Sequence, residues 1–264
     1  MADQESTTIL AAKARKALRL TMNRPQVHNA FNATMIRELA SAFDAAKKDP
    51  EVRLVVLTGA GESFCAGADL NWMREIIRYS YEQNLRESRE LAELMNSIYT
   101  LPKPTIARIN GAVIGGGTGL FSACDIVIAS DRAKFGLSEV KIGLIPAAIG
   151  PYVIRRIGES AAREFFLTGE RFDAQRALEI GLVNKVVAHE SLDDKVEEVV
   201  HLLLSSGPEA IAKCKELLQR VPAMSLDEAK GYTAEMIASL RVSPEGQEGM
   251  AAFLEKRKPK WVKD

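Results

Sequence analysis

Two glycine-containing segments follow strand-like stretches, and their composition suits the binding of negative charge by main-chain N–H groups. The first reads SFCAGADL (63–70) and the second NGAVIGGGTGL (110–120). Small residues at a strand-to-helix junction let a ligand approach the backbone closely, and the first N–H groups of a helix have no intrahelical partner. Two such junctions that meet in space would form an oxyanion hole. For either segment alone, the alternative is a tight turn with close helix packing.

The second segment lacks the G-x-G-x-x-G spacing of a dinucleotide-binding fingerprint, and no acidic residue follows where it would hold a ribose. The chain also lacks the G-x-x-x-x-G-K-S/T phosphate loop. Stabilisation of an anion by main-chain groups is therefore the better functional interpretation of both segments.

Glu139, in the stretch GLSEVK, is the candidate general acid or base. An arbitrary glutamate of this kind would be a surface residue in a loop. Here apolar residues surround it in the sequence: Phe135, Leu137, Val140, Ile142 and Leu144. Because apolar surroundings disfavour the ionised carboxylate, we expect the pKa of Glu139 to rise toward the working pH.

The cysteines and histidines do not suggest a metal or a nucleophile. The three cysteines are Cys65, Cys124 and Cys214, an odd number without metal-ligand spacing. No histidine stands in a motif that would activate Cys65, which we interpret as a small packing residue. The three histidines of the chain have no metal-binding partner at a suitable spacing either. No metal is expected.

Strand-like and helix-like stretches alternate through the first half of the chain, which favours parallel strands in an α/β fold. Expected strands cover 16–22, 54–57, 105–109 and 126–129, and expected helices include one with Met35, Leu39 and Phe43 on one face and one over 83–98. From residue 191 the pattern is helical only, over 191–205, 208–219, 226–240 and 244–257. We predict an α/β core over 1–190 and a helical C-terminal region over 191–264.

The composition argues against large charged partners. Lys plus Arg (35) balances Asp plus Glu (35), so no global field points to nucleic acid or to a membrane surface. The sequence has no apolar run of transmembrane length. Its first ten residues, MADQESTTIL, lack the features of a secretory signal. We expect a cytoplasmic protein without a membrane or nucleic-acid partner.

Beyond the two glycine segments, ACDI (123–126), FGLSEVKIGLIP (135–146) and ALEIGLV (177–183) complete a set of motifs that resembles the enoyl-CoA hydratase/isomerase (crotonase) superfamily. The resemblance runs in order from NRP (23–25) to FLEK (253–256). Around 144–147 and 151–154 it is most similar to bacterial methylglutaconyl-CoA hydratases. It implies a ClpP-like spiral of ββα units and a helical C-terminal trimerisation region, in a homotrimer or a dimer of trimers.

The resemblance also implies roles for individual residues. The thioester oxygen would be held by the backbone N–H groups of Ala68 and Gly116, and Glu139 would be the catalytic acid or base. Hydratases of the family commonly carry a second glutamate three residues after the middle glycine. Gly119 stands at that position here. Isomerases often keep only the glutamate that matches Glu139, so this departure puts the two-glutamate hydration mechanism in doubt.

By the same resemblance, an acyl-CoA substrate would lie along two loops, and coenzyme A would be part of the substrate, with no other cofactor. The loop residues are Gln26, Val27, His28, Ala66, Gly67, Ala68, Asp69 and Leu70. Arg24 is a candidate for the phosphates, with an ordinary turn arginine as the alternative. Phe253 and Lys256 match a pair that reaches the ligand of an adjacent subunit, within a basic tail that is otherwise a solvated terminus.

These observations predict an acyl-CoA hydratase acting on a 2-enoyl-CoA thioester, and the local resemblance at 144–154 implies a thioester of the methylglutaconyl type. The alternative is a single-glutamate enoyl-CoA isomerase. A non-catalytic or RNA-binding relative is a third hypothesis, against which the zero net charge counts.

Overall fold

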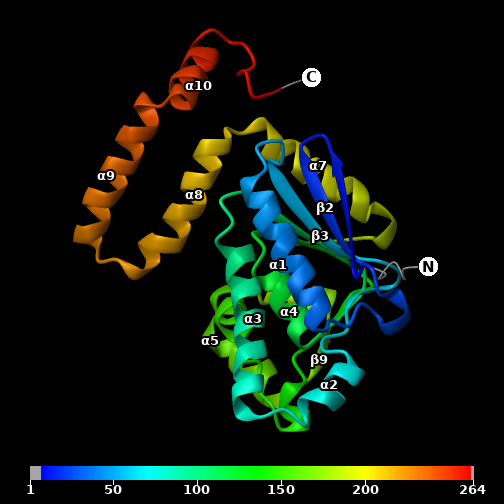
Figure 1. Cartoon of the computed structure of the whole chain (residues 1–264). Helices are drawn as coiled ribbons and strands as arrows, with labels where there is room; N and C mark the ends of the chain where they lie inside the picture. Colours follow the sequence, from blue (N-terminus) through cyan, green and yellow to red (C-terminus); the bar gives the residue numbers. More distant parts are fainter. Residues whose placement is uncertain (1–6, 263–264) are drawn as a thin grey trace.

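The computed structural model describes residues 7–262, which form two β-sheets with helices on either side (Figure 1). The larger sheet has the strand order β1-β2-β3-β5-β7-β10. Its strands are β1 (Ile9–Ala14), β2 (Ala17–Met22), β3 (Leu54–Gly59), β5 (Thr105–Ile109), β7 (Ile126–Ser130) and β10 (Lys185–Val187). Only β1 runs antiparallel to its neighbour, so the sheet is essentially parallel, as the alternating sequence pattern predicts.

The central strand β3 is buried along its whole length because helices cover both faces of the sheet. Side chains alternate across a strand. Val55 and Leu57 therefore join the core cluster that contains helices α1 (Ala33–Lys48) and α3 (Tyr81–Tyr99). Leu54 and Val56 face the other way and join the cluster formed with α7 (Leu192–Ser205).

Four short strands form a second sheet in the order β4-β6-β8-β9. They are β4 (Ser63–Cys65), β6 (Ala112–Ile114), β8 (Lys134–Gly136) and β9 (Arg171–Asp173). Three of them follow directly after β3, β5 and β7 of the larger sheet, and each is followed by helix. The chain thus repeats a strand–strand–helix unit, which confirms the predicted spiral of ββα units.

Each repeat delivers a loop and a helix to the neighbourhood of the small sheet. The helix after β4 is α2 (Leu70–Ile76), the helix after β6 is α4 (Gly116–Ser122), and β8 leads to the 3₁₀ turn η2 (Glu139–Ile142) and then α5 (Gly150–Thr168). All three predicted chemical segments therefore lie just beyond the small sheet.

The last helices leave the sheets progressively. After α7 come α8 (Pro208–Arg220), α9 (Leu226–Val242) and α10 (Pro244–Leu254), and α9 and α10 project from the rest of the molecule (Figure 1). Buried Lys215 fixes α8 to the sheets, since its ammonium group lies 2.5 Å from Asp125 Oδ2 and donates to the Lys103 carbonyl at 3.1 Å. Helix α7, which follows residue 190, packs on the large sheet together with β3. The predicted division of the chain at residue 190 therefore stays a prediction.

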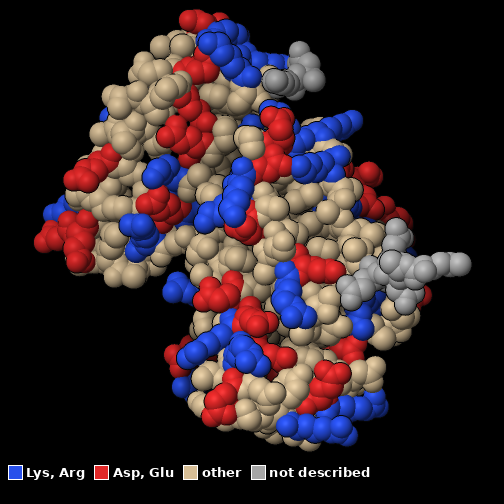
Figure 2. Space-filling view, viewed as in Figure 1, with Lys and Arg blue, Asp and Glu red and all other residues tan. Residues whose placement is uncertain are grey.

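The face seen in Figure 2 carries Lys and Arg interspersed with Asp and Glu, in keeping with the zero net charge. Within residues 7–262, no helix has both the length and the apolar character needed to cross a membrane.

Candidate active site

The loop between β4 and α2 is held by the backbone of Phe31. The Phe31 N–H donates to the Gly67 carbonyl at 2.8 Å, and the Asp69 N–H donates to the Phe31 carbonyl at 2.9 Å. Phe31 and Ala68 thus form a parallel bridge. In this bridge Phe31 hydrogen-bonds to the residues before and after Ala68. The N–H group of Ala68 itself therefore points away from Phe31. That N–H makes no hydrogen bond within residues 7–262.

Asp69 fixes the end of this loop to the start of α2. Its carboxylate accepts from the backbone N–H groups of Asn71 and Trp72 at 2.7 and 3.4 Å, which caps the helix. Its other oxygen lies 2.7 Å from the Arg24 guanidinium. Burial opposes ionisation of Asp69, but the Arg24 and Asn71 hydrogen bonds outweigh it and lower the pKa of this carboxyl.

Arg24, the predicted phosphate ligand, is therefore already engaged. Besides Asp69, its guanidinium donates to the Ala30 carbonyl at 2.6 Å. The side chain orders the loop that carries Ala68, and contact with a phosphate stays a prediction.

The second glycine segment approaches the first at the start of α4. Gly115 has a positive φ of 53°, and its N–H donates to the Gly136 carbonyl at 2.8 Å. A Cβ atom on Gly116 would lie 2.4 Å from the Phe31 ring, and a Cβ atom on Gly117 would lie 2.7 Å from the Cys65 carbonyl oxygen. A side chain at position 116 would displace the Phe31 ring, and one at position 117 would collide with the backbone of Cys65.

Phe31 thus contacts both segments, with its backbone against the Ala68 loop and its ring against Gly116. The Gly116 N–H, like that of Ala68, donates to no other group in the described part of the chain. A Cβ atom on Gly67 would lie 3.9 Å from the Gly116 nitrogen, which shows how close the two segments are. The sequence predicts this meeting of the segments but gives no indication of Phe31.

Glu139 lies beside this junction, at the first residue of η2. Its Oε1 atom lies 3.1 Å from the position that a Cβ atom on Gly115 would take. Its Oε2 atom is buried and has no hydrogen-bond partner within residues 7–262. Burial raises the pKa of Glu139, as its sequence context predicts.

Fewer of the apolar residues near Glu139 in the sequence are buried than expected. Phe135 and Leu137 are fully buried, but Ile142 and Leu144 are 59% and 57% exposed. The two exposed side chains therefore do not enclose the carboxyl in the single chain, whereas the Cβ position of Gly115 lies 3.9 Å from Oε2.

Gly119 adjoins Ile149, a residue that the sequence does not single out. A Cβ atom on Gly119 would lie 2.1 Å from Ile149 Cγ2 and 2.6 Å from Ile149 Cβ, with Met95 Sδ at 3.4 Å. Ile149 is buried at the start of α5. The volume that a side chain at position 119 would need is therefore filled by an apolar residue.

Among the residues predicted to contact coenzyme A, the N-terminal group lies together. Gln26 and His28 are exposed, and His28 Nδ1 lies 3.1 Å from Ser63 Oγ, at the start of β4. The Ala66 N–H donates to the His28 carbonyl at 2.9 Å, which joins the two predicted loops. Leu70 is 70% exposed.

Phe253 and Lys256 lie far from the other predicted coenzyme A residues within one chain. Phe253 is 83% exposed near the end of α10, and Figure 1 places α10 at the opposite end of the molecule from α2. Their predicted contact with a ligand therefore requires a second chain.

Cys65 is a packing residue, as expected, because it is buried under Gly117 and burial raises the pKa of its thiol to about 12. The described residues contain no group of three side chains able to hold a metal ion.

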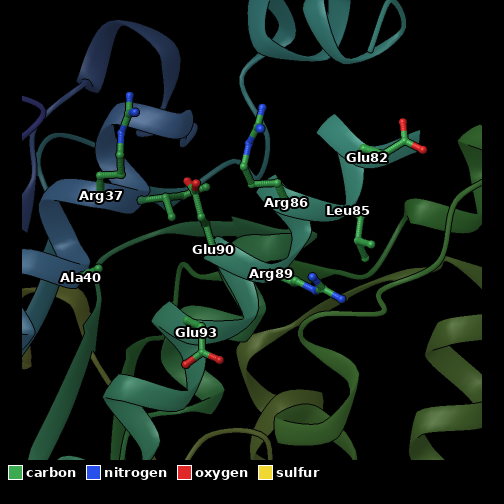
Figure 3. A pocket seen from close by; sticks show the side chains of 9 residues that line it. Arg37, Ala40, Glu82, Leu85, Arg86, Arg89, Glu90 and Glu93 are labelled. Carbon is green, nitrogen blue, oxygen red and sulfur yellow. The ribbon is translucent and has the colours of Figure 1, made fainter. Parts of the chain in front are cut away.

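The groove drawn in Figure 3 has a volume of about 660 Å³ and lies between α1 and α3. Its lining consists of Ile36, Arg37 and Ala40 from α1 and Glu82, Leu85, Arg86, Arg89, Glu90 and Glu93 from α3. None of the residues discussed above for catalysis or coenzyme A contact lines this groove, so it does not help to define the site.

Replacing Glu139 with glutamine is expected to preserve or raise stability near neutral pH. A carboxyl whose pKa is raised on folding stabilises the fold below its ordinary value of 4.5, and this contribution is lost as the pH rises through the folded pKa. Thermal unfolding should show Glu139→Gln melting about 2 °C higher than the wild type at about pH 8, with the difference vanishing near pH 4. A variant that is less stable at both pH values would contradict the absence of a partner for Oε2.

Comparison with known proteins agrees with this geometry. Residues 13–264 match the family model described as enoyl-CoA hydratase/isomerase. The chain is 35% identical to the short-chain-enoyl-CoA hydratase of Clostridium acetobutylicum, with 96% of this chain and 97% of that protein covered.

Solved structures of similar proteins have the same fold. A crystal structure of an enoyl-CoA hydratase from Shewanella pealeana is 42% identical with a TM-score of 0.94, covering 98% of this chain and 97% of that one. A crystal structure of an enoyl-CoA hydratase/isomerase from Marinobacter aquaeolei is 36% identical with a TM-score of 0.93, covering 98% of this chain and 100% of that one. The chain therefore belongs to the enoyl-CoA hydratase/isomerase (crotonase) family.

Proposed function

We propose that this protein adds water across the double bond of a 2-enoyl-CoA thioester. The observation that carries the proposal is the placement of the Glu139 carboxyl, partly buried and with a raised pKa, directly beside the junction of the Ala68 and Gly116 segments. A candidate proton donor thereby lies beside two segments that each carry an N–H group without an acceptor in the described residues.

In the proposed reaction, the oxygen of water bonds to C3 and the C2–C3 π electrons move toward the thioester carbonyl. Negative charge then accumulates on the carbonyl oxygen, where the N–H groups of Ala68 and Gly116 would stabilise it. Donors of this kind are each worth about 10²–10³ in rate. Glu139 donates its proton to C2 and takes back the proton that the added water releases. The moved atoms all come from water and Glu139, so the proposed step uses no cofactor besides the coenzyme A of the substrate.

The attacking water must be oriented by a group other than a second glutamate. Ile149 fills the place where hydratases of the family commonly have a second glutamate, so position 119 offers no carboxylate to hold the water. We propose that a carboxylate on the substrate, as in a methylglutaconyl-type thioester, orders it. Equal turnover of a carboxyl-free enoyl-CoA would contradict this part of the proposal.

The packing of Ile149 on Gly119 also favours a second function, migration of a double bond in a 3-enoyl-CoA. Glu139 alone could remove a proton from C2 and return it at C4, a reaction that needs no bound water.

The two functions are separated by following the absorbance of the conjugated enoyl thioester from 2-enoyl-CoA and from 3-enoyl-CoA in parallel. We expect absorbance to fall with the 2-enoyl substrate and a 3-hydroxyacyl product to appear by mass. Glu139→Gln should lower kcat about 10²–10⁴-fold. A rise from the 3-enoyl substrate without hydration would instead establish the isomerase. No turnover of either substrate, together with salt-sensitive RNA retention, would favour a non-catalytic relative.

Installing the second glutamate should require two substitutions. Gly119→Glu alone is expected to destabilise the fold by about 1–3 kcal/mol without a gain in hydration, because its Cβ overlaps Ile149. In Gly119→Glu combined with Ile149→Gly, we expect stability to recover and the ratio of hydration to isomerisation to rise about tenfold or more. Ile149→Gly alone is the matched control, and an equal rise in that variant would show that the new carboxylate is not responsible.

We further propose that the chain assembles as a homotrimer or a dimer of trimers and works in the cytoplasm. Every residue of α9 is exposed or half-buried in the single chain. Large apolar side chains are uncovered along α9 and α10, with Leu226 at 87%, Val242 at 78% and Leu254 at 79% exposure. Surfaces of this kind are typical of interfaces between subunits.

Light scattering coupled to gel filtration should give three or six times the mass of the single chain. Exchanging Phe253 and Leu254 for glutamate should lower that mass, because charges would replace the exposed apolar side chains of α10. A monomeric wild type at micromolar concentration would contradict the proposed assembly.

A further inference from the structure

Helix α2 lies next to the candidate oxyanion hole and is anchored by Trp72. This is the side chain of α2 that is buried, at 8% exposure, whereas Met73 and Ile76 are half-buried and the other residues of the helix are exposed. Its indole N–H donates to Glu87 Oε2 on α3 at 3.0 Å. The position of the Trp72 ring is therefore set from outside its own helix.

The other side of Trp72 contacts Phe31. The two rings meet edge to face, with centroids 5.9 Å apart and an interplanar angle of 61°. Phe31 is 3% exposed, and it touches both segments that carry the proposed oxyanion donors, as described above. A contiguous chain of contacts thus leads from Glu87 through Trp72 and Phe31 to the Ala68 and Gly116 amides.

We propose that Trp72 and Glu87 are positioning residues that hold Phe31 in place and thereby keep the Ala68 and Gly116 N–H groups converging on one oxygen. The inference rests on the proposed function, since it assigns these two residues to the same oxyanion hole. Neither residue donates to the oxygen itself. The hydrogen bond between the indole and a carboxylate is charge-assisted, and it fixes the rotation of a ring whose edge contact with Phe31 depends on its orientation.

The predicted signature is a loss of kcat without a loss of coenzyme A binding. Trp72→Phe removes the hydrogen bond and keeps an aromatic ring, and Glu87→Ala removes the acceptor from a half-buried position on a helix that favours alanine. Each should lower kcat about tenfold, with KM and the affinity for free coenzyme A unchanged. The double variant should lose no more than either single variant, because both delete the same interaction.

Two further variants make the test specific. Glu87→Gln keeps an oxygen that accepts from the indole N–H and should retain most of the activity. Trp261→Phe is the matched control, since the Trp261 indole N–H also donates at 3.0 Å, to the Ser205 carbonyl near the C-terminus. It should turn over substrate like the wild type.

Infrared spectroscopy of a bound, unreactive thioester measures the polarisation of its carbonyl group by the oxyanion hole without turnover. The infrared carbonyl frequency of bound butyryl-CoA, labelled with ¹³C at the thioester carbon, reports how strongly the two N–H groups polarise the C=O bond. We expect the wild type, Glu87→Gln and Trp261→Phe to lower this frequency, and Trp72→Phe and Glu87→Ala to lose much of that shift.

The outcomes distinguish the positioning role of Trp72 and Glu87 from the oxyanion hole itself. A shifted frequency in the wild type that persists in folded Trp72→Phe and Glu87→Ala, with unchanged kcat, would overturn the positioning role and leave the proposed function standing. Loss of free coenzyme A affinity in parallel with kcat would also overturn it, because the damage would then be general. An unshifted carbonyl in the wild type would overturn the proposed oxyanion hole and this inference with it.

Discussion

Two backbone segments can present N–H groups to one oxygen only if nothing larger than hydrogen separates them, and this constraint shapes the centre of the molecule. A Cβ atom added at Gly67 would lie 2.9 Å from the Ile114 carbonyl oxygen, and one added at Gly117 would lie 2.7 Å from the Cys65 carbonyl oxygen. The repeated ββα unit brings the two segments together on neighbouring strands β4 and β6. Phe31 then fills the remaining space and contacts both segments. The fold provides a rigid frame for two free amides.

The same region tolerates features that oppose stability. Glu139 buries a carboxyl oxygen without a hydrogen-bond partner, and this raises its pKa. A group that costs stability when ionised, next to two unused N–H groups, is better explained by chemistry than by packing. Lys215 and Asp125 show the contrast, because there a buried ammonium group is matched by a carboxylate and a carbonyl. The Glu139 carboxyl thus lacks the compensation that the Lys215 ammonium group has.

Much of the fold could be predicted from local pattern. The expected strands at 54–57, 105–109 and 126–129 match β3, β5 and β7, because buried parallel strands have short, continuous apolar sequences. The three-residue strands of the small sheet escaped prediction because they are too short for any periodicity, and β1 because its side chains are mostly exposed. In the site, glycines and Glu139 have recognisable contexts. Phe31 and Ile149 act through long-range packing, which spacing along the chain does not reveal.

A crystal structure with a bound enoyl-CoA or its saturated analogue would show whether the two amides and Glu139 act on the same thioester. We expect the thioester oxygen to lie within hydrogen-bond distance of both the Ala68 and the Gly116 nitrogens, about 2.7–3.1 Å. We also expect a Glu139 carboxyl oxygen to lie within about 3.2 Å of C2, or one water away. A thioester oxygen that contacts neither amide, or a substrate whose C2 points away from Glu139, would contradict the proposed mechanism.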